Sequence, residues 1–130
     1  MTAVYAPRTP GSQNKPLGDR GERLAAEYLE RAGWTILARN YRLGHREVDL
    51  VAQRGEVVAF VEVKTRAGLG YGHPLEAITA RKRREIQQVA QAWVHAHGRE
   101  GDSYRYDAIA VLIIDGAAPE IEHIEDAWWM

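Results

Sequence analysis

The sequence of 130 residues has the length of one domain and is long enough to bury a hydrophobic core without disulfides. It contains no cysteine, which excludes disulfides, thiolate zinc sites and a cysteine nucleophile. The net charge of −1 excludes a global attraction for nucleic acid, so any such attraction must come from local basic clusters. No apolar run approaches the roughly 20 residues of a membrane span, and the N-terminus lacks the apolar core of a signal peptide. We therefore expect a cytoplasmic protein with no membrane partner.

The N-terminal region combines a proline-rich segment with a helical pattern. Residues 1–16 carry prolines and small polar residues with little apolar content, and they predict a flexible arm before a single domain of residues 17–130. Apolar residues then recur at helical spacing from Leu17 to Ala32 and predict the first helix, which Gly33 would end.

Two glycines and an acidic residue lie near the start of this predicted helix. Gly18 and Gly21 would permit a close approach by another element, because neither has a side chain. Glu22 lies at the edge of the apolar stripe rather than opposite it. By residue chemistry alone, Glu22 is best explained as an acidic first-turn residue that the helix dipole stabilises.

The stretch from residue 47 to residue 64 holds the strongest functional pattern. It follows a predicted first strand at residues 34–41. Two β-rich segments within it flank Arg54-Gly55, and a glycine between such segments predicts a hairpin turn. If Arg54-Gly55 is a two-residue turn, Gln53 pairs with Glu56.

Side-chain alternation along this hairpin brings charged residues together. Glu62 and Lys64 share one strand face with Phe60. The predicted register places Asp49 opposite Phe60 and on the same face, one diagonal step of roughly 7–8 Å from Glu62. A loop of three or five residues without a compensating bulge would instead put Asp49 on the other face.

Two carboxylates and an ammonium on one patch of sheet can support metal-assisted chemistry. Asp49 and Glu62 could share Mg²⁺, which takes oxygen ligands, while Lys64 could orient or deprotonate a water. The metal could polarise a phosphoryl oxygen or lower the pKa of that water. The alternative is a solvated sheet face with ordinary edge charges, because Glu-x-Lys is a common pattern. The aspartate on the neighbouring strand favours the site.

A glycine-rich loop and a second helix follow the hairpin. Residues 65–75 predict an irregular loop beside the carboxylate patch, where Tyr71 and His73 could stack on or bond to a ligand. Residues 76–97 contain the second helix, and Thr79 is the predicted N-cap of its main body.

The start of the second helix carries the densest basic cluster of the chain, Arg81-Lys82-Arg83-Arg84. Most such runs are solvated helix faces, but a basic cluster can also contact nucleic-acid phosphates. Lys82 is in line with the buried stripe, one turn before Ile86. We expect Lys82 to point toward the sheet while its neighbours spread around the helix.

The last third of the chain predicts two further strands. Residues 104–115 are apolar on both faces, which is typical of a covered, central strand, and residues 121–124 form a short final strand. Asp107 enters the buried strand and is either paired, for instance with an arginine, or part of the site. The segment Trp128-Trp129-Met130 either folds back on the core or meets a partner subunit.

The order helix, three strands, helix, two strands, with Asp49 before Glu62-Val63-Lys64, resembles the restriction-endonuclease-like superfamily and its PD-(D/E)xK motif. Four segments resemble more closely the YraN-like family of bacterial proteins, related to archaeal Holliday-junction resolvases: Leu17-Gly-Asp-Arg-Gly-Glu22-Arg-Leu-Ala-Ala-Glu-Tyr-Leu29, Arg46-Glu-Val-Asp-Leu50, Phe60-Val-Glu-Val-Lys-Thr-Arg66 and Arg105-Tyr-Asp107. The resemblance implies an α/β, restriction-endonuclease-like core. Its mixed central sheet of about five strands, in the order α-β-β-β-α-β-β, would be flanked by helices.

The resemblance also implies roles for individual residues. Asp49 and Glu62 would be ligands of Mg²⁺, or of Mn²⁺ as a substitute, with the backbone carbonyl of Val63 as a further ligand. Glu22 would be an active-site acid and Lys64 the catalytic lysine. The residues expected to contact DNA are Arg66, Arg81, Lys82, Arg83 and Arg84.

Two positions depart from the patterns that carry this resemblance. Arg46 stands where the family usually has glycine, and Val48 stands where the nuclease signature has proline. Neither departure removes a metal ligand. A nuclease fold does not by itself guarantee nuclease activity.

Three functions remain open from the sequence. The first is a metal-dependent endonuclease that hydrolyses DNA, including branched DNA, where symmetric cutting of a junction would need a two-fold homodimer. The second is a non-catalytic nucleic-acid-binding module that retains the nuclease fold, and the third is an adaptor whose partner surface includes the C-terminal tryptophans. The complete acidic and lysine positions favour the first over the second, whereas the near-neutral charge favours the third.

Overall fold

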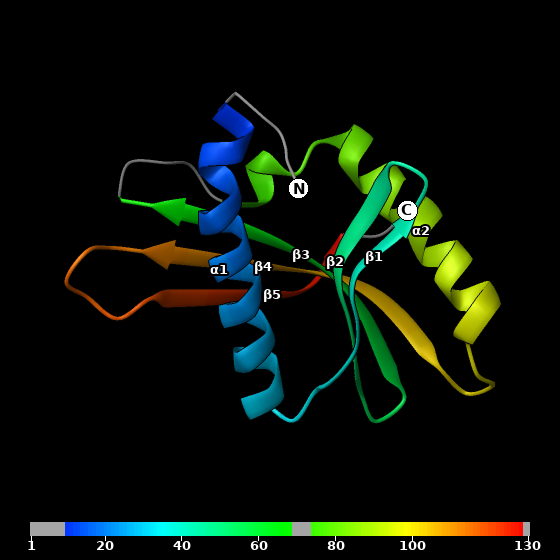
Figure 1. Cartoon of the computed structure of the whole chain (residues 1–130). Helices are drawn as coiled ribbons and strands as arrows, with labels where there is room; N and C mark the ends of the chain where they lie inside the picture. The colour runs from blue at the N-terminus through cyan, green and yellow to red at the C-terminus, as the bar shows by residue number, and fades with distance from the viewer. Residues whose placement is uncertain (1–9, 69–73, 129–130) are drawn as a thin grey trace.

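A five-stranded sheet with one long helix on each face forms the architecture of the protein (Figure 1). The computed structural model describes residues 10–68 and 74–128. The elements are α1 (Pro10–Arg31), β1 (Thr35–Leu43), β2 (Arg46–Arg54), β3 (Val57–Ala67), the 3-10 helix η1 (Pro74–Ala77), α2 (Ala80–His97), β4 (Ser103–Ile113) and β5 (Glu120–Trp128). The strands lie in the order β1-β2-β3-β4-β5; β3 and β4 are parallel, and the other pairs are antiparallel. The predicted fold class and element order are confirmed.

Two hydrophobic clusters, one on each side of the sheet, hold the helices in place. Ala25, Ala26 and Leu29 of α1 pack with one set of strand residues, which includes Val61 and Val63. On the other side, Ile86, Val89 and Trp93 of α2 pack with Val58 and Phe60. Successive residues of β3 alternate between the two clusters, as the period of a strand requires, so the predicted division of faces in β3 is confirmed.

The first helix begins seven residues earlier than predicted, at Pro10 instead of Leu17. Proline suits the first turn of a helix, because the missing N–H has no partner there. Pro16 lies inside the helix. An exposed ion pair between Lys15 and Asp19 (Nζ–Oδ2 3.0 Å) spans this proline and links successive helical turns. The composition of this segment therefore misled the prediction. Residues 1–9 of the predicted arm lie outside the described residues.

The hairpin between β2 and β3 has a different register from the predicted one. Arg54 pairs with Val57, so the two turn residues are Gly55 and Glu56 rather than Arg54 and Gly55. Gly55 has a φ of +62°, and glycine is favoured at the first central position of a type II′ turn. Leu50 pairs with Val61, so the register shifts by two residues relative to the prediction. A shift of two preserves which face each side chain occupies.

The remaining boundaries agree with the predictions to within a few residues. Thr79 caps α2, and its Oγ1 accepts a hydrogen bond from the Lys82 N–H at 3.1 Å. Trp128 is buried and stacks on Tyr106, so this tryptophan folds back on the core, whereas Trp129 and Met130 lie outside the described residues. Tyr71 and His73 also lie outside them. None of the helices in the described ranges has the length and hydropathy needed to span a membrane.

Candidate active site

The candidate site begins where β2 and β3 stop pairing. The ladder of pairs between them ends at Leu50 and Val61. Beyond this point, the Asp49 side chain bonds to the β3 backbone: its Oδ2 accepts a hydrogen bond from the Val63 N–H at 2.8 Å. Side-chain alternation also breaks here, since Val48 and Val51 both pack in the cluster on the α2 side. The Asp49 side chain therefore reaches across to β3, beside Glu62.

Asp49 and Glu62 form a buried pair of carboxyl groups. Their exposed fractions are 8% and 4%, and each carboxyl group affects the pKa of the other. Burial and then the charge of Glu62 raise the pKa of Asp49 well above its ordinary value. Burial also raises the pKa of Glu62, although the nearby Lys82 ammonium opposes this. Burial therefore favours the protonated form of both carboxyl groups over the charged form.

One oxygen of this pair is left without a partner. Among the described residues, nothing donates a hydrogen bond to the buried Oε1 of Glu62. An unpaired buried oxygen costs free energy, and a bound cation would remove that cost. Carboxylate oxygens are the ligands that Mg²⁺ prefers, so the donor chemistry of Asp49 and Glu62 fits this ion.

The described residues contain no group of three or more His, Cys, Asp or Glu side chains arranged around a common metal position. Mg²⁺ is nevertheless often held by only one or two protein carboxylates, with waters and substrate phosphates completing its shell. The pair formed by Asp49 and Glu62 meets this smaller requirement.

Glu22 lies well inside α1 and approaches the pair from the other side of the sheet. It is not a first-turn residue, so the interpretation through the helix dipole is wrong. Its Oε1 accepts a hydrogen bond from Asn40 Nδ2 at 2.9 Å. Burial and then the charge of Asp49 raise the pKa of Glu22 to about 7.

Asn40 was missed in the sequence. It has a φ of +49°, and it lies between the β1–β2 pairs Arg39–Leu50 and Tyr41–Val48. Asparagine is one of the few residues that tolerate this left-handed conformation. An asparagine inside an otherwise alternating strand was the signal that could have indicated this left-handed position.

Close packing of α1 on β3 places Glu22 near Lys64. A Cβ at Gly21 would collide with the side chain of Thr65, so the predicted close approach is confirmed at Gly21, whereas Gly18 has open space around it. A cleft of about 480 Å³ lies along this contact, and the predicted site residues among its lining are Glu22, Val63, Lys64 and Arg66.

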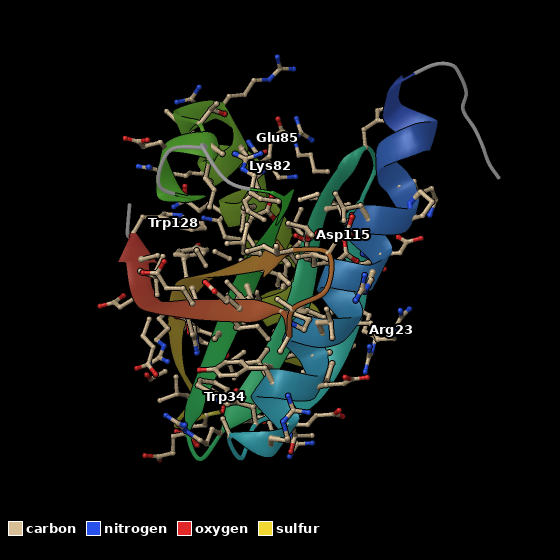
Figure 2. The ribbon with its side chains drawn as sticks, turned by 90° about the vertical axis from the view of Figure 1, so that its left-hand side faces the viewer. Arg23, Trp34, Lys82, Glu85, Asp115 and Trp128 are labelled. Carbon is tan, nitrogen blue, oxygen red and sulfur yellow. The ribbon has the colours of Figure 1, made fainter. Side chains whose placement is uncertain are left out.

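The predicted basic cluster does not stay together. Lys82 points to the sheet as predicted, and its Nζ lies 3.9 Å from Glu62 Oε2. Arg83 packs over the ring of Trp128 at 5.9 Å from the ring centroid, while Arg81 pairs with Glu85 (Nε–Oε2 3.4 Å) and Arg84 is exposed. Figure 2 shows Lys82 and Glu85 near the start of α2. One of the four residues therefore reaches the carboxylate pair, and two remain on the outer surface.

Asp107 belongs to a separate network and not to this site. Its carboxylate accepts hydrogen bonds from Arg105 (Nε at 3.0 Å), from the His123 ring (Nε2 at 2.8 Å) and from the Asp126 N–H (3.0 Å). Tyr28 of α1 bonds the other ring nitrogen of His123 at 3.1 Å. The predicted pairing with an arginine is confirmed, and the roles of His123 and Tyr28 were not foreseen.

Comparisons with known proteins identify the family of this chain and a solved structure that is similar to it. The 1.6 Å structure of Archaeoglobus fulgidus Hjc, described as a Holliday junction resolvase, matches 81% of this chain and 75% of its own chain, with 22% identity and a TM-score of 0.46. A UPF0102 protein of Rhodococcus jostii is 48% identical over 117 residues, 90% of this chain and 99% of the relative. Another, from Geobacter sulfurreducens, is 49% identical over 115 residues, 88% of this chain and 90% of the relative. The family model described as "Uncharacterised protein family UPF0102" matches residues 21–111. The chain belongs to this UPF0102, or YraN-like, family.

Proposed function

We propose that this protein is a metal-dependent endonuclease that hydrolyses phosphodiester bonds of DNA, with branched DNA among its substrates. The observation that carries the proposal is the buried pair of Asp49 and Glu62 with its unpartnered oxygen. Such an arrangement is costly unless a cation joins it, and hard carboxylate oxygens suit Mg²⁺ or, as a substitute, Mn²⁺. The cysteine-free composition suits a reducing cytoplasm, where we place this activity.

In this proposal each site residue has a stated role. Asp49, Glu62 and the backbone carbonyl of Val63 hold the ion, which when bound would polarise a phosphoryl oxygen and activate a water. Lys64 stabilises the negative charge that develops on the phosphate in the transition state. Glu22, with a pKa of about 7, exchanges a proton near neutral pH.

Lys64→Ala tests the assignment, with Lys15→Ala as a matched control on exposed α1 surface. We expect Lys64→Ala to lower single-turnover cleavage by roughly 10²–10³-fold, because the ammonium acts mainly in the transition state, with little loss of DNA affinity measured in Ca²⁺. Supercoiled, linear and four-way-junction DNA would be incubated with Mg²⁺ or Mn²⁺.

The outcomes separate the proposed functions. Equal cleavage by wild type and Lys64→Ala would show that the active site is wrongly assigned. If the wild type binds DNA but cuts none of the three forms with either metal, a non-catalytic nucleic-acid-binding module replaces the nuclease. Paired cuts placed symmetrically across a junction would in addition support a two-fold dimer, since the described part of each protomer holds one buried carboxylate pair.

A further inference from the structure

A basic groove lies between the tip of the β1–β2 hairpin and the first turns of α2. It has a volume of about 450 Å³, and its charged lining residues are His45, Arg46, Arg81, Arg84 and Glu85. Figure 1 shows the hairpin tip beside the start of α2. Neither Glu22 nor the carboxylate pair lines this groove, so it is a surface distinct from the proposed active site.

The groove concentrates positive charge on a chain whose net charge is −1. Three arginines and one histidine line it against a single acidic residue, Glu85. Glu85 pairs with Arg81, whose side chain is nevertheless 85% exposed. Arg46 and Arg84 are also exposed, so their guanidinium groups are accessible to an anionic partner.

The groove and the proposed active site both adjoin the first turn of α2. Lys82 follows Arg81 directly, and its ammonium lies 3.9 Å from Glu62. The first turn of α2 therefore contacts the carboxylate pair on one side and lines the groove on the other.

We propose that this groove binds the phosphate backbone of duplex DNA beside the phosphodiester that is cut; this proposal rests on the proposed function. Charged side chains without a hydrophobic floor suit backbone contacts, which position DNA without reading its bases. Among the described residues, the groove lining contains no Phe, Tyr or Trp, whereas proteins that hold single strands commonly stack bases on such rings. The chemistry of the groove therefore favours a duplex over a single strand.

The test compares two double variants that remove the same charge. Arg46→Ala with Arg84→Ala empties the groove of two exposed cations. Arg23→Ala with Arg31→Ala removes two exposed arginines from α1, on the opposite face of the sheet, where Figure 2 labels Arg23. Fluorescence anisotropy would measure binding to duplex DNA in Ca²⁺ at several salt concentrations, after thermal melting confirms that both variants are folded.

We expect the groove variant to bind duplex roughly tenfold or more weakly and to reduce the slope of log affinity against log salt by about two, one per phosphate contact, while the α1 variant stays at wild-type values. The single variant Arg84→Glu provides the same test, with a loss in the same direction, if the double variant is unstable.

Three results would overturn the proposal. Unchanged affinity and slope in the groove variant, with a wild type that binds duplex, would exclude the groove and leave the nuclease proposal standing. A wild type that binds no DNA would exclude both. An equal or larger loss on single-stranded DNA or on RNA of the same length would exclude a duplex as the partner.

Discussion

Two buried carboxyl groups that face each other oppose folding, because both lose hydration and their charges repel. Asp49→Asn relieves this, since the Asn side-chain oxygen still accepts from the Val63 N–H and its amide can donate to Glu62. We expect the variant to raise the free energy of unfolding of the metal-free protein by about 1 kcal/mol. Urea denaturation with a chelator at pH 7 measures this, with the exposed Asp115→Asn as control. A lower stability would contradict the account of the pair.

The same substitution should abolish stabilisation by metal. An ion that binds the native state alone raises the free energy of unfolding by mass action. We expect Mg²⁺ or Mn²⁺ to stabilise the wild type and to leave Asp49→Asn unchanged, because the variant lacks one of the two proposed carboxylate ligands. Isothermal titration of each ion into each protein gives an independent reading, and equal binding by both proteins would rule out Asp49 as a ligand.

Glu22 makes stability depend on pH near neutrality. Its pKa rises from 4.5 to about 7 on folding, so between these values the native state holds the proton more tightly than the unfolded state. The free energy of unfolding must therefore fall as pH rises through this window. Glu22→Gln should reduce that fall by about 1 kcal/mol, because solvent screens a half-buried group. Urea denaturation from pH 4.5 to 7.5 tests this, with exposed Glu30→Gln as control; identical profiles for wild type and Glu22→Gln would refute it.

The contact between α1 and β3 sets the spacing of the proposed active site. Gly21 adjoins Glu22 in α1, and Thr65 adjoins Lys64 in β3. A Cβ at Gly21 would collide with the Thr65 side chain, so a larger residue at this position would push α1 away from β3. We expect Gly21→Ala to destabilise the protein by about 1–3 kcal/mol through overpacking. Gly18→Ala meets open space within the same helix and should stabilise it by about 0.5–1 kcal/mol. Chemical denaturation of both variants provides the comparison. A Gly21→Ala variant with the same free energy of unfolding as the wild type would show that α1 can shift without loss of stability.

Across the whole molecule, the network around Asp107 joins α1, β4 and β5. Burial alone would raise the pKa of Asp107, but hydrogen bonds from His123, the Asp126 N–H and Arg105 lower it below its ordinary value. The stability that it contributes is therefore present above pH 3.8 and is lost as pH falls through its lowered pKa. The largely buried Arg105 guanidinium and the buried His123 ring would lose their shared partner if the carboxylate were removed.

Asp107→Asn should accordingly lower the free energy of unfolding at neutral pH by about 3 kcal/mol, since it leaves buried partners uncompensated. The variant should also lose less stability than the wild type between neutral pH and pH 3. Acid and urea denaturation measure both effects. A neutral-pH stability within error of the wild type would show that the network does not hold the three elements together.

Local chemistry made much of this protein predictable from its sequence. The alternation of β3, which puts Glu62 and Lys64 on one face, depends on neighbours in the chain, as do the cap at Thr79 and the direction of Lys82. The helical and strand periods are properties of the backbone, so both long helices and all five strands were found with their types, whereas the short 3-10 helix η1 was not predicted. The carboxylate pair was foreseen because an error of two residues in register leaves the facing side chains on the same side.

The tertiary structure alone decided which distant residues meet. The Gly55-Glu56 turn brings Asp49 across to Glu62, and the contact of Gly21 with Thr65 carries Glu22 into the same region, where Asn40 bonds it. The basic run at the start of α2 divides between the carboxylate pair, the ring of Trp128 and the groove at the hairpin tip. These contacts depend on strand register and on how closely the helices approach the sheet. Packing between segments far apart in the chain determines both the register and the approach. The periodicity of a single segment does not predict these long-range contacts.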